Sequence, residues 1–124
     1  MASKRQTAEK LVERVFAGDA IGVISNQVLS EIFYVLTRRI GRPLGSNTAL
    51  GIIRKYALSD KWTRVDYTTA TAIKAASDST ASAVPFWDAL IAETMKENGI
   101  SKIITENEKD FRRIPGITAV NPFK

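Results

Sequence analysis

Short apolar segments that alternate with helical segments restrict the fold of this chain more than any other feature. The apolar segments cover residues 22–24, 102–105 and 117–120, and a brief edge strand is expected at 64–67. Strands that alternate with helices form βαβ units, in which the strands are parallel and the helices cover both faces of the sheet. The sequence therefore predicts an α/β fold with a mainly parallel sheet.

Capping residues and apolar spacing mark five helices between these strands. Ser3 and Gln6 have the spacing of a capping box, and Gly18 follows the first apolar stripe as a C-cap. Residues 78–83 are expected to form a loop because of their small and polar composition. The helices are expected at residues 3–16, at 26–39, at 46–56 with Ser46 or Asn47 as the cap, at 68–77, and at 85–98 with Pro85 first.

The length of 124 residues fits one domain over residues 1–124 and leaves no room for a second sizeable core. No apolar run approaches the roughly 18 residues of a membrane span, so no membrane partner is expected. Charges at Lys4, Arg5, Glu9 and Lys10 interrupt the region where a signal peptide would carry its apolar stretch. These features predict a cytoplasmic protein.

The absence of cysteine and histidine narrows the chemistry that the chain can perform. It excludes disulfides, thiolate nucleophiles and zinc–thiolate sites, and it removes the commonest general base and metal ligand. Carboxylates with Mg²⁺ or Mn²⁺ are then the leading option for an enzyme. The formal net charge of +5 and the pI near 9.7 favour a polyanionic partner.

Two acidic residues occupy helix positions that the apolar pattern assigns to the interior. Glu31 lies on the apolar stripe of helix 26–39, and Asp88 repeats this pattern at the start of helix 85–98. By contrast, Glu93, Lys96 and Glu97 are assigned to an opposite, solvated face. A carboxylate on a buried stripe is costly unless it is paired or binds a cation, so Glu31 and Asp88 are candidates for a metal site.

The expected topology brings these acids and Asp110 to one edge of the sheet. Helices that follow parallel strands begin at the carboxyl edge of the sheet, where ligands bind. Glu31 lies in the second turn of such a helix, Asp88 lies in the first turn of another, and Asp110 lies just past strand 102–105. Three carboxylates on one rim repel one another unless a cation lies among them.

Each acid also has a simpler explanation when it is considered alone. Asp88 could be an acid of a first helical turn that the helix dipole stabilises, and Asp110 could be an ordinary loop aspartate. The joint position of the three acids on one rim favours the metal site. Glu31 could instead pair with one of the arginines Arg38, Arg39, Arg42 and Arg54.

Three motifs resemble those of the PIN domain family, especially the VapC-type toxin ribonucleases of toxin–antitoxin pairs. Residues 24–31, ISNQVLSE, resemble the family signature IS-x-x-x-L-x-E. Residues 86–92, FWDALIA, resemble the WDALIA helix, and residues 105–111, TENEKDF, resemble the T-x-N-x-x-D-F block. The ending at residues 114–123 also fits, so the resemblance covers essentially the whole chain.

The resemblance implies a three-layer α/β/α fold, homodimers, and an antitoxin whose tail blocks the site. It also implies hydrolysis of RNA phosphodiester bonds that depends on Mg²⁺ or Mn²⁺. Glu31, Asp88 and Asp110 would bind the metal, and Asn107 and Thr105 would shape the site through hydrogen bonds. A divalent cation would activate water in such a site, so that no histidine base is required.

Basic and aromatic residues near the same rim have two interpretations. The basic residues could hold phosphates, although solvated surface charge explains them equally well. Phe86 and Trp87 could stack on bases, but packing in the core is the favoured interpretation for aromatic residues beside an apolar helix face. The basic residues concerned are Arg38, Arg39, Lys109, Arg112 and Arg113.

The chain departs from the family pattern at its start. The family begins with a strand in the middle of the sheet that ends in Asp-x-Asn, whereas no Asp-x-Asn precedes Gly22 here. Metal affinity and RNA cleavage are therefore expected to fall sharply in this chain, and neighbouring strands are expected to keep unpaired backbone groups. A truncated gene product or a misassigned start would explain the departure. The alternatives to a ribonuclease are a non-catalytic module that binds nucleic acid or antitoxin, and a remnant without function.

Overall fold

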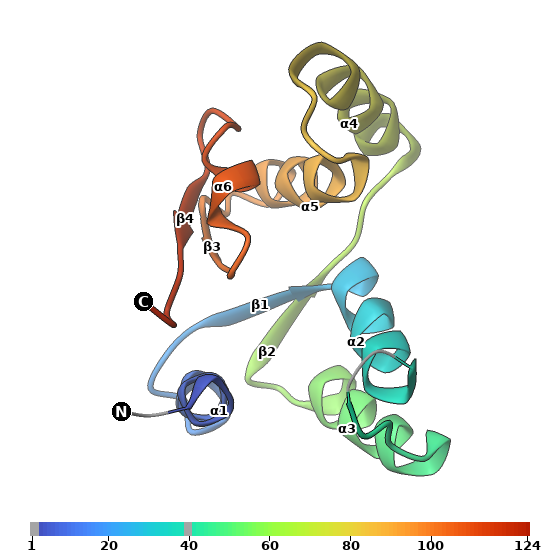
Figure 1. The fold of residues 1–124 in the computed structure, drawn as a ribbon, viewed down its shortest axis with the longest axis vertical. Coiled ribbons are helices and arrows are strands. Elements are labelled where there is room, and N and C mark those ends of the chain that lie inside the picture. The colour runs from blue at the N-terminus through green and yellow to red at the C-terminus, as the bar shows by residue number, and fades with distance from the viewer. Residues whose placement is uncertain (1–2, 39–40) are drawn as a thin grey trace. The chain divides into compact units, whose positions relative to one another are not determined.

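A computed structural model describes residues 3–38 and 41–124, and its contacts divide the chain into two compact units. The N-terminal unit comprises Glu9–Asp66, and the C-terminal unit comprises Tyr67–Lys124 together with the start of the chain up to Ala8. Figure 1 shows the ribbon of both units. The single domain expected over residues 1–124 stays a prediction.

Helices and strands are interspersed along the chain, as the sequence predicts. In chain order they are α1 (Lys4–Phe16), β1 (Gly22–Ser25), α2 (Asn26–Arg38), α3 (Ser46–Leu58), β2 (Trp62–Val65), α4 (Thr69–Ser82), α5 (Phe86–Glu97), β3 (Lys102–Ile104), α6 (Glu108–Phe111) and β4 (Thr118–Val120). None of the helices within the described ranges has the length and apolar character that a membrane crossing requires.

Each unit contains one pair of parallel strands. In the N-terminal unit β1 pairs with β2, with Gly22 opposite Trp62, and in the C-terminal unit β3 pairs with β4, with Lys102 opposite Thr118. Every strand pair in the described residues is therefore parallel. The predicted α/β class with parallel strands is confirmed.

The start of α1 is fixed by the capping box that the sequence predicts. The Ser3 hydroxyl oxygen accepts a hydrogen bond from the backbone N–H of Gln6 at 3.1 Å, and Gln6 Oε1 accepts one from the backbone N–H of Ser3 at 3.0 Å. Gly18, with a φ of 84°, follows the helix in the left-handed region. Both predicted ends of this helix are confirmed.

Three half-buried aromatic residues form a cluster in the N-terminal unit. The centroid of the Phe16 ring lies 5.5 Å from that of Tyr56 and 5.8 Å from that of Trp62, and the Tyr56 and Trp62 centroids lie 5.0 Å apart. The rings meet in tilted or edge-on arrangements. Burial raises the pKa of the Tyr56 hydroxyl. Gly22 packs against this cluster, because a β-carbon there would lie 2.6 Å from Val15 Cγ1 and 2.8 Å from Trp62 Cζ3. Only glycine lets β1 approach so closely.

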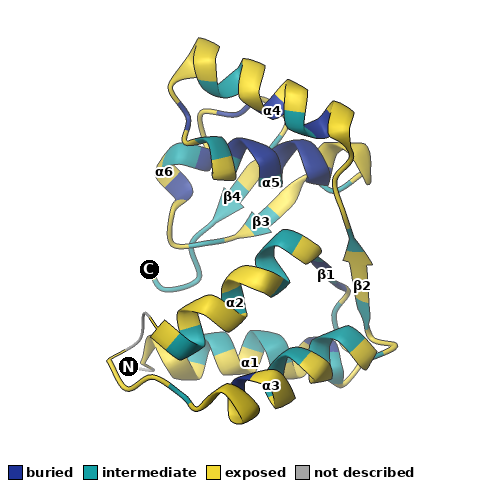
Figure 2. Ribbon diagram, turned by 90° about the vertical axis from the view of Figure 1, so that its right-hand side faces the viewer, coloured by how far each residue is buried: buried dark blue, intermediate teal, exposed yellow. Residues whose placement is uncertain are grey.

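Helix α5 forms the interior of the C-terminal unit. Figure 2 shows buried positions concentrated along it. Ala75 of α4 and Ala89 and Ala92 of α5 are at most 2% exposed, and these small side chains let the two helices approach closely. The same core also includes Val84, Leu90, Phe111 and Ile114.

Helix α4 is longer than the sequence predicts. The loop expected at residues 78–83 is wrong, because α4 continues to Ser82 before Ala83 adopts a left-handed conformation with a φ of 58°. The hydroxyls of Thr80 and Ser82 donate to backbone carbonyl oxygens four residues earlier, at 2.8 and 2.7 Å. Side chains that are common in loops are thus satisfied inside a helix.

Three smaller features differ from the expectations. Helix α3 has Gly45 at its N-cap without a side-chain hydrogen bond, so neither Ser46 nor Asn47 caps it. Strand β2 begins at Trp62 rather than at Arg64, because its pairing with β1 includes the tryptophan. Helix α6 is not predicted, since four residues are too few to show helical periodicity.

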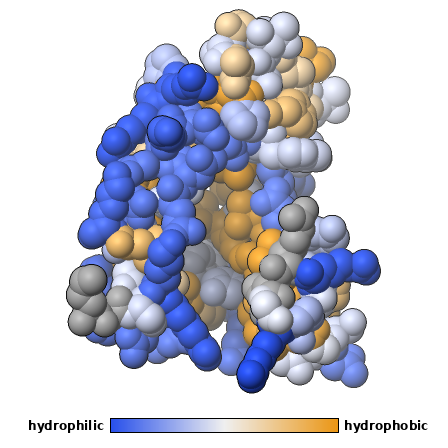
Figure 3. Space-filling view, viewed as in Figure 1, coloured by the Kyte–Doolittle hydropathy of each residue, from blue (hydrophilic) through white to orange (hydrophobic). Residues whose placement is uncertain are grey.

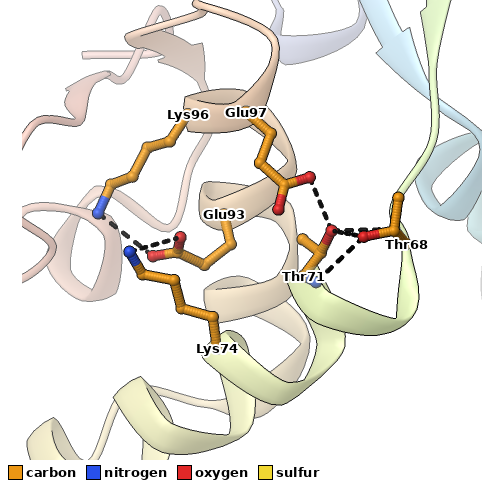
Figure 4. Close-up of polar contacts among 6 residues, drawn as sticks. All are labelled: Thr68, Thr71, Lys74, Glu93, Lys96 and Glu97. Atoms are coloured by element: carbon orange, nitrogen blue, oxygen red, sulfur yellow. Dashed lines mark hydrogen bonds and ion pairs between the residues drawn. The ribbon is translucent and has the colours of Figure 1, made fainter.

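Glu93 is buried, although the sequence assigns it to a solvated face of α5. Helix α4 packs against α5 and leaves Glu93 only 2% exposed. Its carboxylate accepts a hydrogen bond from Lys96 at 3.3 Å and lies 3.8 Å from the Lys74 ammonium (Figure 4). Burial, and then a hydrogen bond with Asp78, raise the pKa of Glu93 against the opposing effect of Lys96.

The start of α4 is joined to the end of α5 through Thr71. This residue is fully buried, and its Oγ1 donates to Glu97 Oε2 at 2.7 Å (Figure 4). Thr68 and Thr71 form a capping box in which each side chain bonds to the backbone of the other. Lys96 and Glu97 are exposed residues, so the expected solvated face is correct for them and wrong for Glu93 alone.

Replacing Gly22 by alanine is expected to lower the free energy of unfolding by about 1–3 kcal/mol, the usual cost of overpacking, because the added methyl group would collide with Val15 and Trp62. Gly51→Ala is the matched control. Gly51 lies inside α3 with nothing within 4 Å of an added β-carbon, so the change is expected to stabilise the chain by up to about 1 kcal/mol. Urea unfolding followed by circular dichroism measures both variants, and equal stabilities would contradict this packing.

Glu93→Gln and Glu108→Gln are expected to change the pH dependence of stability in opposite directions. The folded chain raises the pKa of Glu93, so its contribution to stability is present at low pH and is lost as the pH rises above the usual value of 4.5. A hydrogen bond with Lys124 and the charge of Arg112 lower the pKa of Glu108, so its contribution is present above that value and is lost as the pH falls.

Free energies of unfolding measured between about pH 2 and about pH 8 test this pair of variants. As the pH rises, Glu93→Gln should gain stability relative to the parent and Glu108→Gln should lose it. Profiles parallel to that of the parent for both variants would show that neither carboxyl has a shifted pKa in the folded chain.

Candidate active site

The side-chain amide of Asn107 links two carboxylates that are distant in the sequence. Asn107 Nδ2 donates to Asp88 Oδ2 at 2.9 Å and to Asp110 Oδ2 at 3.0 Å. An amide nitrogen carries two hydrogen atoms, so each carboxylate can receive one. The two oxygens lie within about 6 Å of each other, since both are at hydrogen-bond distance from one nitrogen. We refer to Asp88 and Asp110 as the acid pair.

The elements of the C-terminal unit place these residues. Asp88 lies in the first turn of α5, which follows Pro85, while Asn107 is the N-cap of α6 and Asp110 lies within that helix. Thr105 comes directly after β3, and its Oγ1 accepts a hydrogen bond from the backbone N–H of Asn107 at 3.0 Å. Thr105 thereby stabilises the turn that presents Asn107 to the acid pair.

Glu108 anchors α6 to the end of the chain. The residue is 7% exposed, its Oε2 lies 2.8 Å from Arg112 Nη2, and its Oε1 pairs with Lys124 Nζ. These cations, Lys124 above all, hold the pKa of Glu108 below its usual range. No motif in the sequence marks Glu108, although its spacing of four from Arg112 is the pattern of a helical ion pair. The anchor fixes the helix that carries Asp110.

The acid pair has the donor chemistry of a site for a hard divalent cation. Carboxylate oxygens are the ligands that Mg²⁺ and Mn²⁺ prefer. Neighbouring carboxylates repel each other, and the amide hydrogens reduce this repulsion without neutralising the charge. In the described part of the C-terminal unit, no third acid completes the pair as a metal site. The residues present therefore fit a cation that takes further ligands from elsewhere.

The third acid expected at the site, Glu31, belongs to the N-terminal unit. It lies in the second turn of α2, whose start is stabilised by a hydrogen bond from the backbone N–H of Val28 to Ser25 Oγ at 3.1 Å. Glu31 is exposed, and its Oε1 accepts a hydrogen bond from Gln27 Nε2 at 3.1 Å. The expected burial of Glu31 is wrong, because no residue of α2 is buried where the helix packs against α3 and β1. Its approach to the acid pair stays a prediction.

The basic residues expected near the acid pair are exposed. Lys109 lies within α6, and Arg112 and Arg113 directly follow it. Figure 3 shows hydrophilic side chains gathered over this part of the C-terminal unit. The guanidinium of Arg112 pairs with Glu108, and Arg113 lines a pocket together with Glu93 and Lys96. The predicted binding of nucleic acid by these basic residues stays a prediction.

The other two basic residues were expected at the end of α2. Arg38 is exposed, and its guanidinium carbon lies 5.8 Å from the centroid of the Tyr34 ring, within the range of a cation–π contact. Arg39 lies outside the described residues. Arg38 is therefore oriented by an aromatic neighbour, and its binding of phosphate also stays a prediction.

The two aromatic residues before Asp88 differ in exposure. Phe86 is half-buried and packs against the core, whereas Trp87 is 59% exposed. Their ring centroids lie 5.2 Å apart with an interplanar angle of 70°. The favoured interpretation, packing in the core, is therefore correct for Phe86 and wrong for Trp87, because the first turn of α5 leaves the indole outside that core.

Comparisons with known proteins agree with this fold. The PIN domain family model matches residues 2–117. Among solved structures, the chain is similar to a chain of the DNA-bound VapBC crystal structure from Salmonella typhimurium, with a TM-score of 0.66 and 24% sequence identity. That similarity covers 92% of this chain and 85% of the other, and it establishes a shared fold. A search of curated proteins gives no match. Since the family match spans most of its length, this chain belongs to the PIN domain family.

Proposed function

We propose that this chain is an endoribonuclease that hydrolyses RNA phosphodiester bonds with Mg²⁺ or Mn²⁺, and that it is the toxin of a toxin–antitoxin pair. The acid pair linked by Asn107 carries this proposal. PIN domains are generally nucleases that depend on divalent metals. A sequence without histidine or cysteine also suits chemistry that relies on carboxylates.

In this proposal Asp88 and Asp110 hold the cation through their carboxylate oxygens, and Glu31 provides a third carboxylate. The bound cation supplies water of lowered pKa and neutralises charge on the phosphate. Asn107 keeps the acid pair together, and Thr105 keeps the Asn107 backbone in place. The hydrogen bonds of these two residues thus hold the carboxylates in position before a cation or substrate binds.

The substrate backbone would be held by exposed cations around the site. Lys109 directly precedes Asp110 and Arg113 follows it by three residues, and Arg38 and Arg39 would contribute from the N-terminal unit. Arg112 would contribute only if it exchanged Glu108 for a phosphate. The net charge of +5 would draw the polyanion toward the chain.

A cognate antitoxin protein and a second copy of the chain are the proposed partners. The Salmonella chain that shares the fold belongs to a DNA-bound VapBC complex, which supports an antitoxin for this chain as well. The sequence resemblance to VapC-type toxins supports the homodimer. A cytoplasmic location belongs to the same proposal, because the RNA substrate is found there.

Cleavage of a labelled RNA is expected to need Mg²⁺ or Mn²⁺ and to stop when EDTA is added. Asp88→Asn and Asp110→Asn are each expected to lower the rate on the order of 100-fold, because each removes a charge that binds the cation. Glu106→Gln is the matched control, since Glu106 is an exposed acid of the same segment that pairs with Lys4. Its rate should stay within about twofold of the parent. A loss of similar size in all three variants would contradict the assignment of the acid pair.

The cleavage rate of the parent chain itself is expected to be low. Its 124 residues provide Glu31, Asp88 and Asp110 for the cation, but not the aspartate of the Asp-x-Asn motif that the family pattern adds. Adding an upstream strand that ends in Asp-x-Asn should raise the rate, whereas the same strand with asparagine at the acidic position should not. In the described residues β1 and β3 each pair with a single strand, so an added strand has an edge to join.

Two outcomes would change this view of the parent chain. Robust cleavage without the added strand, abolished by Glu31→Gln, would contradict the expected impairment. An absence of cleavage by either chain, with RNA or antitoxin binding unchanged in Asp88→Asn, would favour a non-catalytic binding module.

Asn107→Ala is expected to lower cleavage at limiting Mg²⁺ about 10- to 100-fold, because the acid pair loses the donor that holds it together. Raising the Mg²⁺ concentration should restore much of the rate. Thr105→Ser keeps the hydroxyl that accepts from the Asn107 backbone and should resemble the parent. Titrating Mg²⁺ in the cleavage assay measures these effects. A defect in Asn107→Ala that no Mg²⁺ concentration relieves would show that Asn107 does more than support metal binding.

A further inference from the structure

An exposed indole lies next to the acid pair. Trp87, at 59% exposure, is the most exposed of the large aromatic residues in the described part of the chain. It directly precedes Asp88 in the first turn of α5. Burial of an indole is favourable in free energy, so a ligand that covers the Trp87 ring would bind the chain more tightly.

The indole is held in a defined orientation. Phe86 is half-buried against the core, and its ring meets the Trp87 ring nearly edge to face, at 5.2 Å between centroids. Such a contact restrains one ring without covering both of its faces. More than half of Trp87 thus remains accessible on a side chain that does not rotate freely.

The position of Trp87, one residue before Asp88 on α5, is compatible with the geometry of a nucleotide. Consecutive residues of an α-helix point about 100° apart, so the indole lies beside the acid pair rather than across it. In a nucleotide the base likewise extends to one side of the phosphate. A phosphodiester at the acid pair could therefore place a neighbouring base against the indole.

We propose that Trp87 is a stacking platform for an unpaired base next to the cleaved phosphodiester. This inference rests on the proposed function. A base inside a duplex already has neighbours on both faces, so it has no face to offer, whereas an unpaired base does. Stacking on an aromatic ring depends little on base identity, so Trp87 would select for unpaired structure rather than for sequence.

The net positive charge of the chain favours nucleic acid over a second copy of the chain as the group that covers Trp87. Lys109, Arg112 and Arg113 are exposed on and after α6, which also carries Asp110 of the acid pair. A second copy would bring the same net charge of +5 toward this surface, whereas RNA brings compensating phosphates.

The test measures binding in EDTA, so that cleavage is not required. A labelled single-stranded RNA of about 12 nucleotides, its duplex, and a series with one abasic nucleotide at each position are titrated with the parent, Trp87→Ala and Trp87→Phe. Ile73→Ala is the matched control, because Ile73 is an apolar residue of α4 with 67% exposure. Sedimentation of each variant reports its oligomeric state.

The parent is expected to bind the single strand more tightly than the duplex. Trp87→Ala is expected to bind the single strand about 10-fold more weakly than the parent does. The affinities of Trp87→Phe and Ile73→Ala should stay within about threefold of that of the parent. One abasic position should weaken the parent about 10-fold and leave Trp87→Ala unaffected, which identifies the stacked base. The parent binding the single strand no better than Trp87→Ala does would overturn this inference and leave the proposed function standing. A changed oligomeric state in Trp87→Ala would assign the residue to a chain–chain interface instead. A parent that binds none of these RNAs would also overturn this inference, whereas Mg²⁺-dependent cleavage decides separately whether the proposed function stands.

Discussion

Two carboxylates of like charge do not stay together without a donor or a cation between them, and the site of this chain is organised around that constraint. Asn107 Nδ2 supplies a hydrogen to each member of the acid pair. The surrounding contacts keep this amide in place: Thr105 accepts from the Asn107 backbone, and Glu108 holds α6 to Arg112 and Lys124. Since these contacts belong to the protein alone, they hold the acid pair in place before the proposed cation binds.

Helix α5 connects the interior of the C-terminal unit with its site. Its buried residues pack against α4 and α6, so the first turn, with Asp88, has a fixed position. The same helix carries a second acid in a very different environment. Glu93 is buried between Lys74 and Lys96, where burial raises its pKa, whereas Asp88 lies beside another carboxylate at a more open end of the helix. Glu93 is thus part of the packing between α4 and α5, whereas Asp88 accepts a hydrogen bond from Asn107 in the acid pair.

Sequence patterns predicted most of the fold because they report on local geometry. Helical apolar spacing located α1, α2 and α5, and short apolar segments located β1, β3 and β4, which all pair in parallel as the βαβ order requires. The loop expected at residues 78–83 failed because hydroxyl groups that suit a loop also bond to the carbonyls of their own helix. The assignment of Glu93 to a solvated face failed for another reason. The pattern of one helix cannot show which of its faces a neighbouring helix will cover.

The site was predictable to a similar extent. Residue types and topology selected Asp88 and Asp110, and the family resemblance added Asn107, but only the coordinates show one amide between the two acids. The exposure of Trp87 could not be read from its apolar character, because it depends on where the core ends along α5. Glu108 carries no motif, and its anchoring contact with Lys124 joins residues that are distant in the sequence.

Anomalous scattering from a crystal of the chain grown with Mn²⁺ would test the central claim most directly. The account predicts a manganese peak within coordination distance of carboxylate oxygens from both Asp88 and Asp110, and no such peak in crystals of Asp88→Asn. Manganese bound only elsewhere in the parent, with the Asn107 amide still between the two carboxylates, would contradict it.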